Sequence, residues 1–85
     1  MNIEEQFKEA VAGSKSLPSK PDNETLLKLY SLYKQSTEGN NSGSEPANSF
    51  DFIAKAKHNA WIGLQGKLRE DAMQEYVDLV NQLKG

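Results

Sequence analysis

Apolar residues recur at helical spacing in four stretches of this chain, and the residues between these stretches are mostly polar. The first stretch runs from Ile3 to about Ser14, and the second from about Asp22 to Ser36. The third begins near Ser49 and ends between Gly63 and Gly66, and the fourth runs from about Leu68 to Leu83. Because no stretch alternates with a period of two for long enough to form a strand, the pattern predicts an all-α bundle of four helices.

The ends of these predicted helices carry matching local signals. Asn2 can cap the first predicted helix and Asp22 or Asn23 the second, because each side chain can accept a hydrogen bond from the first turn of its helix. Pro18 and Pro21 separate the first two helices, because proline has no N–H to donate and breaks a helix interior. Residues 37–49, TEGNNSGSEPANS, predict a long loop. This loop allows the second and third helices to be parallel, but simple up-and-down order fits the periodicity equally well.

The composition narrows the possible chemistry. The chain has 85 residues, which suits one domain, and it has no cysteine, which excludes a disulfide framework and thiolate chemistry. His58 is the only histidine, which excludes a His-rich metal site and leaves a nucleophile without an evident base. The sequence also lacks a glycine loop of the kind that holds phosphate. We therefore expect a protein that is not an enzyme and that holds no metal or cofactor.

The charge pattern narrows the possible partners. The formal net charge is −2, and acidic residues are interspersed with the lysines, which disfavours a nucleic-acid-binding surface. No apolar run approaches the ~20 residues that span a bilayer, so we expect no stable membrane insertion. The acidic, amphipathic N-terminus, MNIEEQFKEA, does not have the pattern of a signal peptide. These observations predict a soluble, cytoplasmic protein.

One short stretch, LYSLYKQSTEGN, carries the strongest chemical signal. Tyr30, Tyr33 and Lys34 are three or four residues apart, so a helix places them on one face. Lys57 and Trp61 share a face of the third helix in the same way. Aromatic rings beside cations suit a ligand that has a flat ring, phosphate groups and an apolar part. Two other interpretations stay open: the rings can form the edge of the core, or an aromatic rim can bind a partner's amphipathic helix.

Three blocks of the sequence resemble one known family. YSLYKQSTEG resembles the signature Tyr-x-x-Tyr-Lys-Gln-(Ala/Ser)-Thr-x-Gly of the acyl-CoA-binding proteins. DFIAKAKHNAWIGLQG is similar to that family's Asp-Phe-x-x-Lys-Ala-Lys-Trp-x-Ala-Trp-x-x-Leu-x-Gly, and EDAMQEYV is similar to its Glu-Asp-Ala-Met-x-x-Tyr-(Ile/Val). The blocks come in the family's order and close to its spacing, so the resemblance covers essentially the whole chain.

The resemblance implies a four-helix, up-down-down-up bundle in which a long overhand loop joins the second and third helices. It implies a single acyl-CoA-binding domain over residues 1–85, which we expect to be a monomer. It also implies non-catalytic binding of medium- to long-chain fatty acyl-CoA, which such proteins buffer and transport in the cytosol.

The resemblance also assigns roles to individual residues. Lysines would bind the 3′-phosphate of coenzyme A, tyrosines would surround adenine, and an apolar groove would hold the acyl chain. The ligand-binding residues that it implies are Lys15, Tyr30, Tyr33, Lys34, Lys57 and Tyr76. The residues that we expect to contact the acyl chain are Leu26, Leu27, Phe52 and His58. Two residues depart from the family pattern: His58 replaces the first tryptophan of the second block, and Ile53 stands where some members carry a lysine.

Overall fold

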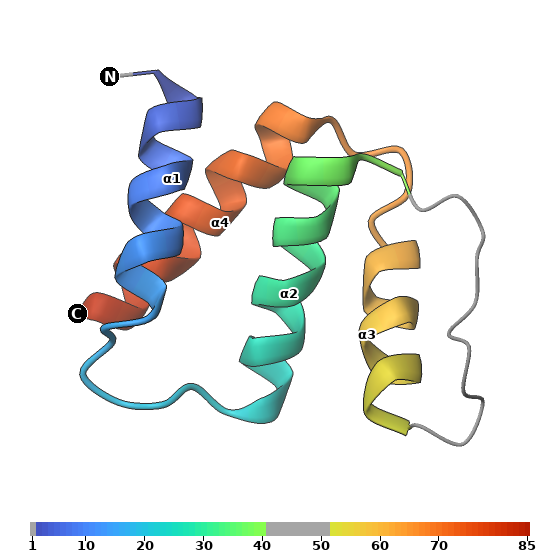
Figure 1. Ribbon diagram of the computed structural model, residues 1–85, viewed down its shortest axis with the longest axis horizontal. Coiled ribbons are helices and arrows are strands. Elements are labelled where there is room, and N and C mark those ends of the chain that lie inside the picture. The colour runs from blue at the N-terminus through green and yellow to red at the C-terminus, as the bar shows by residue number, and fades with distance from the viewer. Residues whose placement is uncertain (1, 41–51) are drawn as a thin grey trace.

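The computed structural model describes residues 2–40 and 52–85 of this chain. In these residues it contains four helices and no strand, which confirms the predicted all-α fold (Figure 1). The helices are α1 (Ile3–Ser14), α2 (Asn23–Glu38), α3 (Phe52–Ile62) and α4 (Arg69–Lys84). The first helix has its predicted bounds, the second continues beyond Ser36, and the fourth begins just after Leu68. The predicted start of the third helix near Ser49 lies outside the described residues.

The first turns of α1 and α2 are capped by the two side chains that the sequence indicates. Asn2 Oδ1 accepts a hydrogen bond from the backbone N–H of Glu5 at 2.9 Å, and Asp22 Oδ1 accepts one from that of Thr25 at 2.8 Å. Hydrogen bonding with the side chain and backbone of Thr25 lowers the pKa of Asp22, because it stabilises the carboxylate. At its other end α2 stops at Gly39, whose φ of 77° lies in the left-handed region that glycine adopts without strain.

The helices run in the directions that the family resemblance implies. α2 and α3 are parallel, and α1 and α4 run the opposite way, so the bundle is up-down-down-up (Figure 1). The end of α2 and the start of α3 therefore lie at opposite ends of the bundle, which requires an overhand connection. The periodicity left simple up-and-down order open, and this arrangement excludes it.

The core is built by three of the four helices. α4 packs against both α1 and α2, whereas α3 packs against α2. The fully buried apolar residues are Phe7, Ala10, Leu29, Leu32, Ala72, Tyr76, Val77 and Val80, which belong to α1, α2 and α4. α3 contributes no fully buried residue, so it forms a wall beside the core rather than part of it. Within the described ranges, no helix has the length and apolarity needed to cross a bilayer.

A buried glutamine on α2 attaches α3 to the rest of the bundle. Gln35 is 0 % exposed, and its Nε2 donates to the carbonyl of Lys67 at 2.7 Å and to Asn40 Oδ1 at 2.9 Å. Its Oε1 accepts a hydrogen bond from Trp61 Nε1 at 3.2 Å, and the same indole N–H lies 3.0 Å from the carbonyl of Gly39. Every polar atom of the buried amide therefore has a partner, as burial requires. The network sets the position of the C-terminal end of α3 against α2.

Candidate functional site

One face of α2 points away from the core and carries half of the predicted ligand-binding residues. An α-helix turns about 100° per residue, so a sector of about 120° collects residues that are three, four or seven positions apart. On α2 this sector contains Asn23, Leu26, Leu27, Tyr30, Tyr33, Lys34 and Thr37. The opposite face carries the buried residues Leu29, Leu32 and Gln35. The helix therefore separates core residues from a continuous row of accessible ones, which we call the site face.

At the N-terminal end of the site face lies an apolar cavity of about 360 Å³ between α2 and α3. Its lining residues are Asn23, Leu26, Leu27, Phe52, Ile53, Ala56 and Lys57. Two of its lining residues are unusually exposed for apolar side chains: Phe52 is 81 % exposed and Ile53 is 70 % exposed. Covering such surface with an apolar ligand is favourable, because it removes apolar area from water.

At the opposite end of the site face lies a larger cavity of about 590 Å³ between α1, α2 and the start of α4. Its lining residues are Glu4, Phe7, Lys8, Val11, Tyr33, Ser36, Thr37, Arg69, Glu70 and Met73. Tyr33 is 41 % exposed, and its ring is stacked on Phe7 with 6.0 Å between the ring centroids. A flat aromatic wall beside hydroxyl groups suits a planar, polar ring.

Two lysines lie in the seam between α2 and α3, and one of them, Lys57, also lines the apolar cavity. Lys57 of α3 places its Nζ 5.2 Å from the ring centroid of Tyr30 on α2. In the reverse sense, Lys34 of α2 places its Nζ 4.9 Å from the ring centroid of Trp61 on α3. The two cation–ring pairs are one helical turn apart, and each joins α2 to α3. Both ammonium groups therefore lie along one seam. This is an arrangement that can bind an anion from two sides.

The ammonium group of Lys34 also has an acidic partner on its own helix. Lys34 Nζ forms an ion pair with Glu38 Oε2 one turn further along α2. Hydrogen bonding to this carboxylate raises the pKa of Lys34 and outweighs the opposing effect of partial burial. The ammonium group of Lys34 is therefore fully charged at neutral pH, and it contacts both the Glu38 carboxylate and the indole ring of Trp61.

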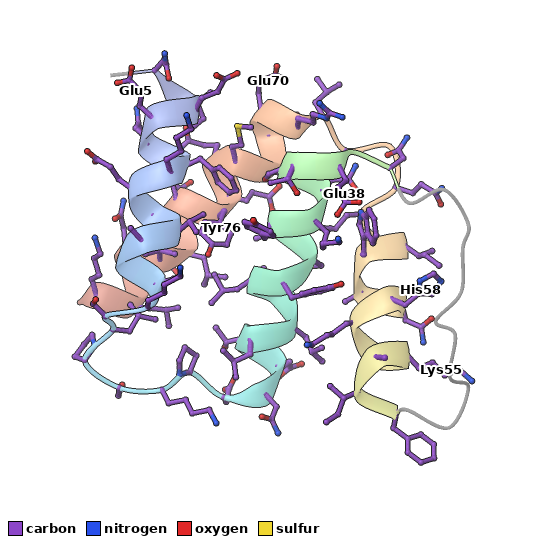
Figure 2. The ribbon with its side chains drawn as sticks, in the orientation of Figure 1. Glu5, Glu38, Lys55, His58, Glu70 and Tyr76 are labelled. Carbon is purple, nitrogen blue, oxygen red and sulfur yellow. The ribbon has the colours of Figure 1, made fainter. Side chains whose placement is uncertain are left out.

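Three of the predicted site residues lie apart from the lysine seam. Lys15 is exposed at the C-cap of α1, on the other side of α2 from α3. Tyr76 is only 4 % exposed; its hydroxyl donates to Ser14 Oγ at 3.3 Å, and its ring meets Phe7 edge-on. Figure 2 shows His58 on the side of α3 that faces away from α2. Contact of these three residues with a ligand stays a prediction, and for His58 this geometry does not favour it.

The sequence reasoning did not identify two residues that the structure places in the site. Phe7 supports the ring of Tyr33, but its position in the apolar stripe of the first helix indicated only a core residue. Glu38 follows Lys34 at helical spacing, so the standard pattern for an intrahelical ion pair was available as a signal. Neither residue is distinguished by its type alone. The contact of Phe7 with Tyr33 depends on how α1 is placed relative to α2, whereas the contact of Glu38 lies within α2.

Comparisons with known proteins all point to one family. The family model described as "Acyl CoA binding protein" matches residues 4–80. The chain is 42 % identical over 81 residues to the acyl-CoA-binding protein of Saccharomyces cerevisiae, with 95 % of this chain and 92 % of the relative covered. It is 48 % identical over 77 residues to the acyl-CoA-binding protein of Dictyostelium discoideum, with 91 % and 90 % covered.

A solved structure provides a similar result for the fold. The crystal structure of Oryza sativa acyl-CoA-binding protein 2 superposes with a TM-score of 0.88 and 38 % sequence identity. The superposition covers 96 % of this chain and 90 % of the rice chain. Because the family model and these relatives extend over nearly the full length, the chain belongs to the acyl-CoA-binding protein family.

Proposed function

We propose that this protein binds medium- to long-chain fatty acyl-CoA esters without catalysing a reaction, and that it buffers and carries them in the cytoplasm as a monomer. The observation that carries the proposal is the order of features along the site face. An apolar cavity, two lysines and an aromatic cavity follow one another from Leu26 to Thr37, which is about 16 Å of helix. An acyl-CoA molecule joins an apolar chain, a phosphorylated ribose and an adenine ring, which are three parts of matching chemistry.

The lysine seam is the proposed site for the 3′-phosphate. A phosphate ester carries about −1.5 to −2 charges near neutral pH. Lys34 and Lys57 approach the seam from two helices and can each donate a charge-assisted hydrogen bond to it. Tyr30 forms the floor between them and can add its hydroxyl group. The family resemblance implies a further basic contact from Lys15, which lies at the end of α1 and apart from this seam.

The acyl chain is proposed to occupy the cavity between the first turns of α2 and α3. Each buried methylene contributes ~0.8 kcal/mol, so ten of them contribute ~8 kcal/mol before the entropic cost of binding is subtracted. Leu26, Leu27 and Phe52 line this cavity, and Phe52 is the most exposed of the three. The chain therefore supplies most of the affinity, while the phosphate and adenine sites select coenzyme A esters over free fatty acids.

Adenine is proposed to rest against Tyr33 in the larger cavity. Stacking of a base on an aromatic side chain contributes about 1–3 kcal/mol in other nucleotide complexes. Tyr33 is supported from behind by Phe7, and Phe7 is in turn contacted by Tyr76. We propose that the buried Tyr76 contributes through this row of rings, by keeping Tyr33 in a position that a base can stack on.

The proposal is tested by isothermal titration calorimetry with dodecanoyl-CoA, free coenzyme A and dodecanoate. We expect saturable one-to-one binding of the ester and affinities at least a hundredfold weaker for each of its two halves, since each half reaches only part of the site. Equal affinity for dodecanoate and for the ester would show that the lysine seam does not recognise coenzyme A. Absence of ester binding by the folded protein would overturn the proposed function.

A further inference from the structure

The residue that the proposed function leaves unexplained is Glu38. A carboxylate beside a phosphate site disfavours phosphate binding, yet Glu38 holds the very ammonium group that the phosphate needs. Figure 2 shows Glu38 at the C-terminal end of α2, on the side that faces α3. Glu38 has roughly half of its side chain exposed, and the side chain of Lys34 is 24 % exposed.

Resting on the proposed function, we propose that Glu38 is an internal competitor of the ligand for Lys34. In the free protein its carboxylate takes the position on the ammonium group that the 3′-phosphate takes in the complex. The residue therefore limits affinity, and it speeds release of the ligand because it recaptures Lys34 as the phosphate leaves.

The geometry around Lys34 explains why competition rather than sharing is expected. The ammonium group has three N–H donors, and one side of it already faces the ring of Trp61 at 4.9 Å. The Glu38 carboxylate already occupies part of the remaining surface of this ammonium group, and a phosphate bound in the seam must contact the same group. If both anions stayed on one ammonium group, they would repel each other at short range. The dianionic phosphate prevails because it also reaches Lys57.

Competition also fits the weakness of the ion pair between Lys34 and Glu38. An exposed ion pair between residues four apart on a helix is weak, so a ligand can displace it with only a small loss of affinity. The backbone at Glu38 does not depend on this ion pair for its position, because Arg69 Nη2 donates a hydrogen bond to the Glu38 carbonyl at 3.3 Å. The Glu38 side chain can therefore leave Lys34 without the end of α2 unwinding.

The variant that tests this proposal is Glu38→Gln, with Glu75→Gln as its matched control. Glu75 forms an ion pair with Lys67, away from the seam, so its substitution removes one negative charge and one ion pair in the same way. For Glu38→Gln we expect roughly two- to threefold tighter binding of dodecanoyl-CoA, which corresponds to loss of an exposed helical ion pair, and a slower dissociation rate. For Glu75→Gln we expect affinity and dissociation rate within error of wild type.

Two further arms separate competition for Lys34 from a general charge effect. In a Lys34→Met background, Glu38→Gln should no longer tighten binding, because the contested group is gone. With 3′-dephospho-dodecanoyl-CoA, the gain from Glu38→Gln should also disappear. A gain that persists in either arm, or weaker binding by Glu38→Gln, would overturn the proposal. Failure of the wild-type protein to bind dodecanoyl-CoA would instead overturn the proposed function.

Discussion

α3 packs against α2 and is joined to the buried Gln35 network through one indole N–H, which Trp61→Phe removes while keeping an aromatic ring. Trp61 Nε1 donates to Gln35 Oε1 at 3.2 Å and to the carbonyl of Gly39 at 3.0 Å. The substitution leaves a buried amide oxygen without its donor, which costs about 1–3 kcal/mol. We expect the free energy of unfolding to fall by this amount, and a loss of 2 kcal/mol to lower Tm by roughly 8–16 °C in a domain of this size.

The assay is urea unfolding followed by far-UV circular dichroism, because Trp61 is the only tryptophan and the substitution removes its fluorescence. Amide hydrogen exchange then locates the loss. Of the described helices, α3 packs only against α2, so its amides should lose more protection than those of α4. Ile53→Val, on an exposed side chain of the same helix, should change stability by less than about 0.5 kcal/mol. A Trp61→Phe effect no larger than this control would show that the hydrogen bonds do not hold α3.

Three other predictions address the ligand and the helix caps. Lys34→Met should weaken dodecanoyl-CoA binding roughly tenfold or more in calorimetry, since a charge-assisted hydrogen bond is lost, and unchanged affinity would refute the phosphate assignment. Phe52→Ser should weaken binding of hexadecanoyl-CoA more than that of octanoyl-CoA, and an equal loss for both would exclude Phe52 from the acyl site. Asp22→Ala should lower Tm at neutral pH, because the cap of α2 is lost. Since the pKa of Asp22 is lowered on folding, the difference from wild type should disappear as the pH falls below the ordinary aspartate range; a difference independent of pH would refute the charged cap.

The rings of Tyr76, Phe7 and Tyr33 form a row that connects the core to the proposed adenine site. Tyr76 contacts Phe7 edge-on with 5.1 Å between centroids, and Phe7 supports Tyr33. Tyr76 is part of the core, so we expect a change at this position to alter the proposed platform for adenine through Phe7. Substitutions in the core of α4 are therefore expected to affect the nucleotide end of the site before they affect the acyl end.

The sequence by itself determined the four helices, the candidates for the side-chain caps of the first two and the residues that share the site face. These are properties of neighbouring positions: a turn of helix brings residues three and four apart together, and a cap is formed within four residues. Tyr30, Tyr33 and Lys34 could therefore be placed together with no knowledge of the fold. The family resemblance added the helix directions, which periodicity could not provide because it describes each helix separately.

Only the tertiary structure decided which side chains meet across helices. The contacts of Lys57 with Tyr30 and of Lys34 with Trp61 depend on how α3 lies against α2. Gln35 is polar but fully buried, because the Lys67 carbonyl, the side-chain oxygen of Asn40 and the indole N–H of Trp61 satisfy its amide group. A polar side chain can be buried only where such partners converge, and the packing of the helices alone brings them together.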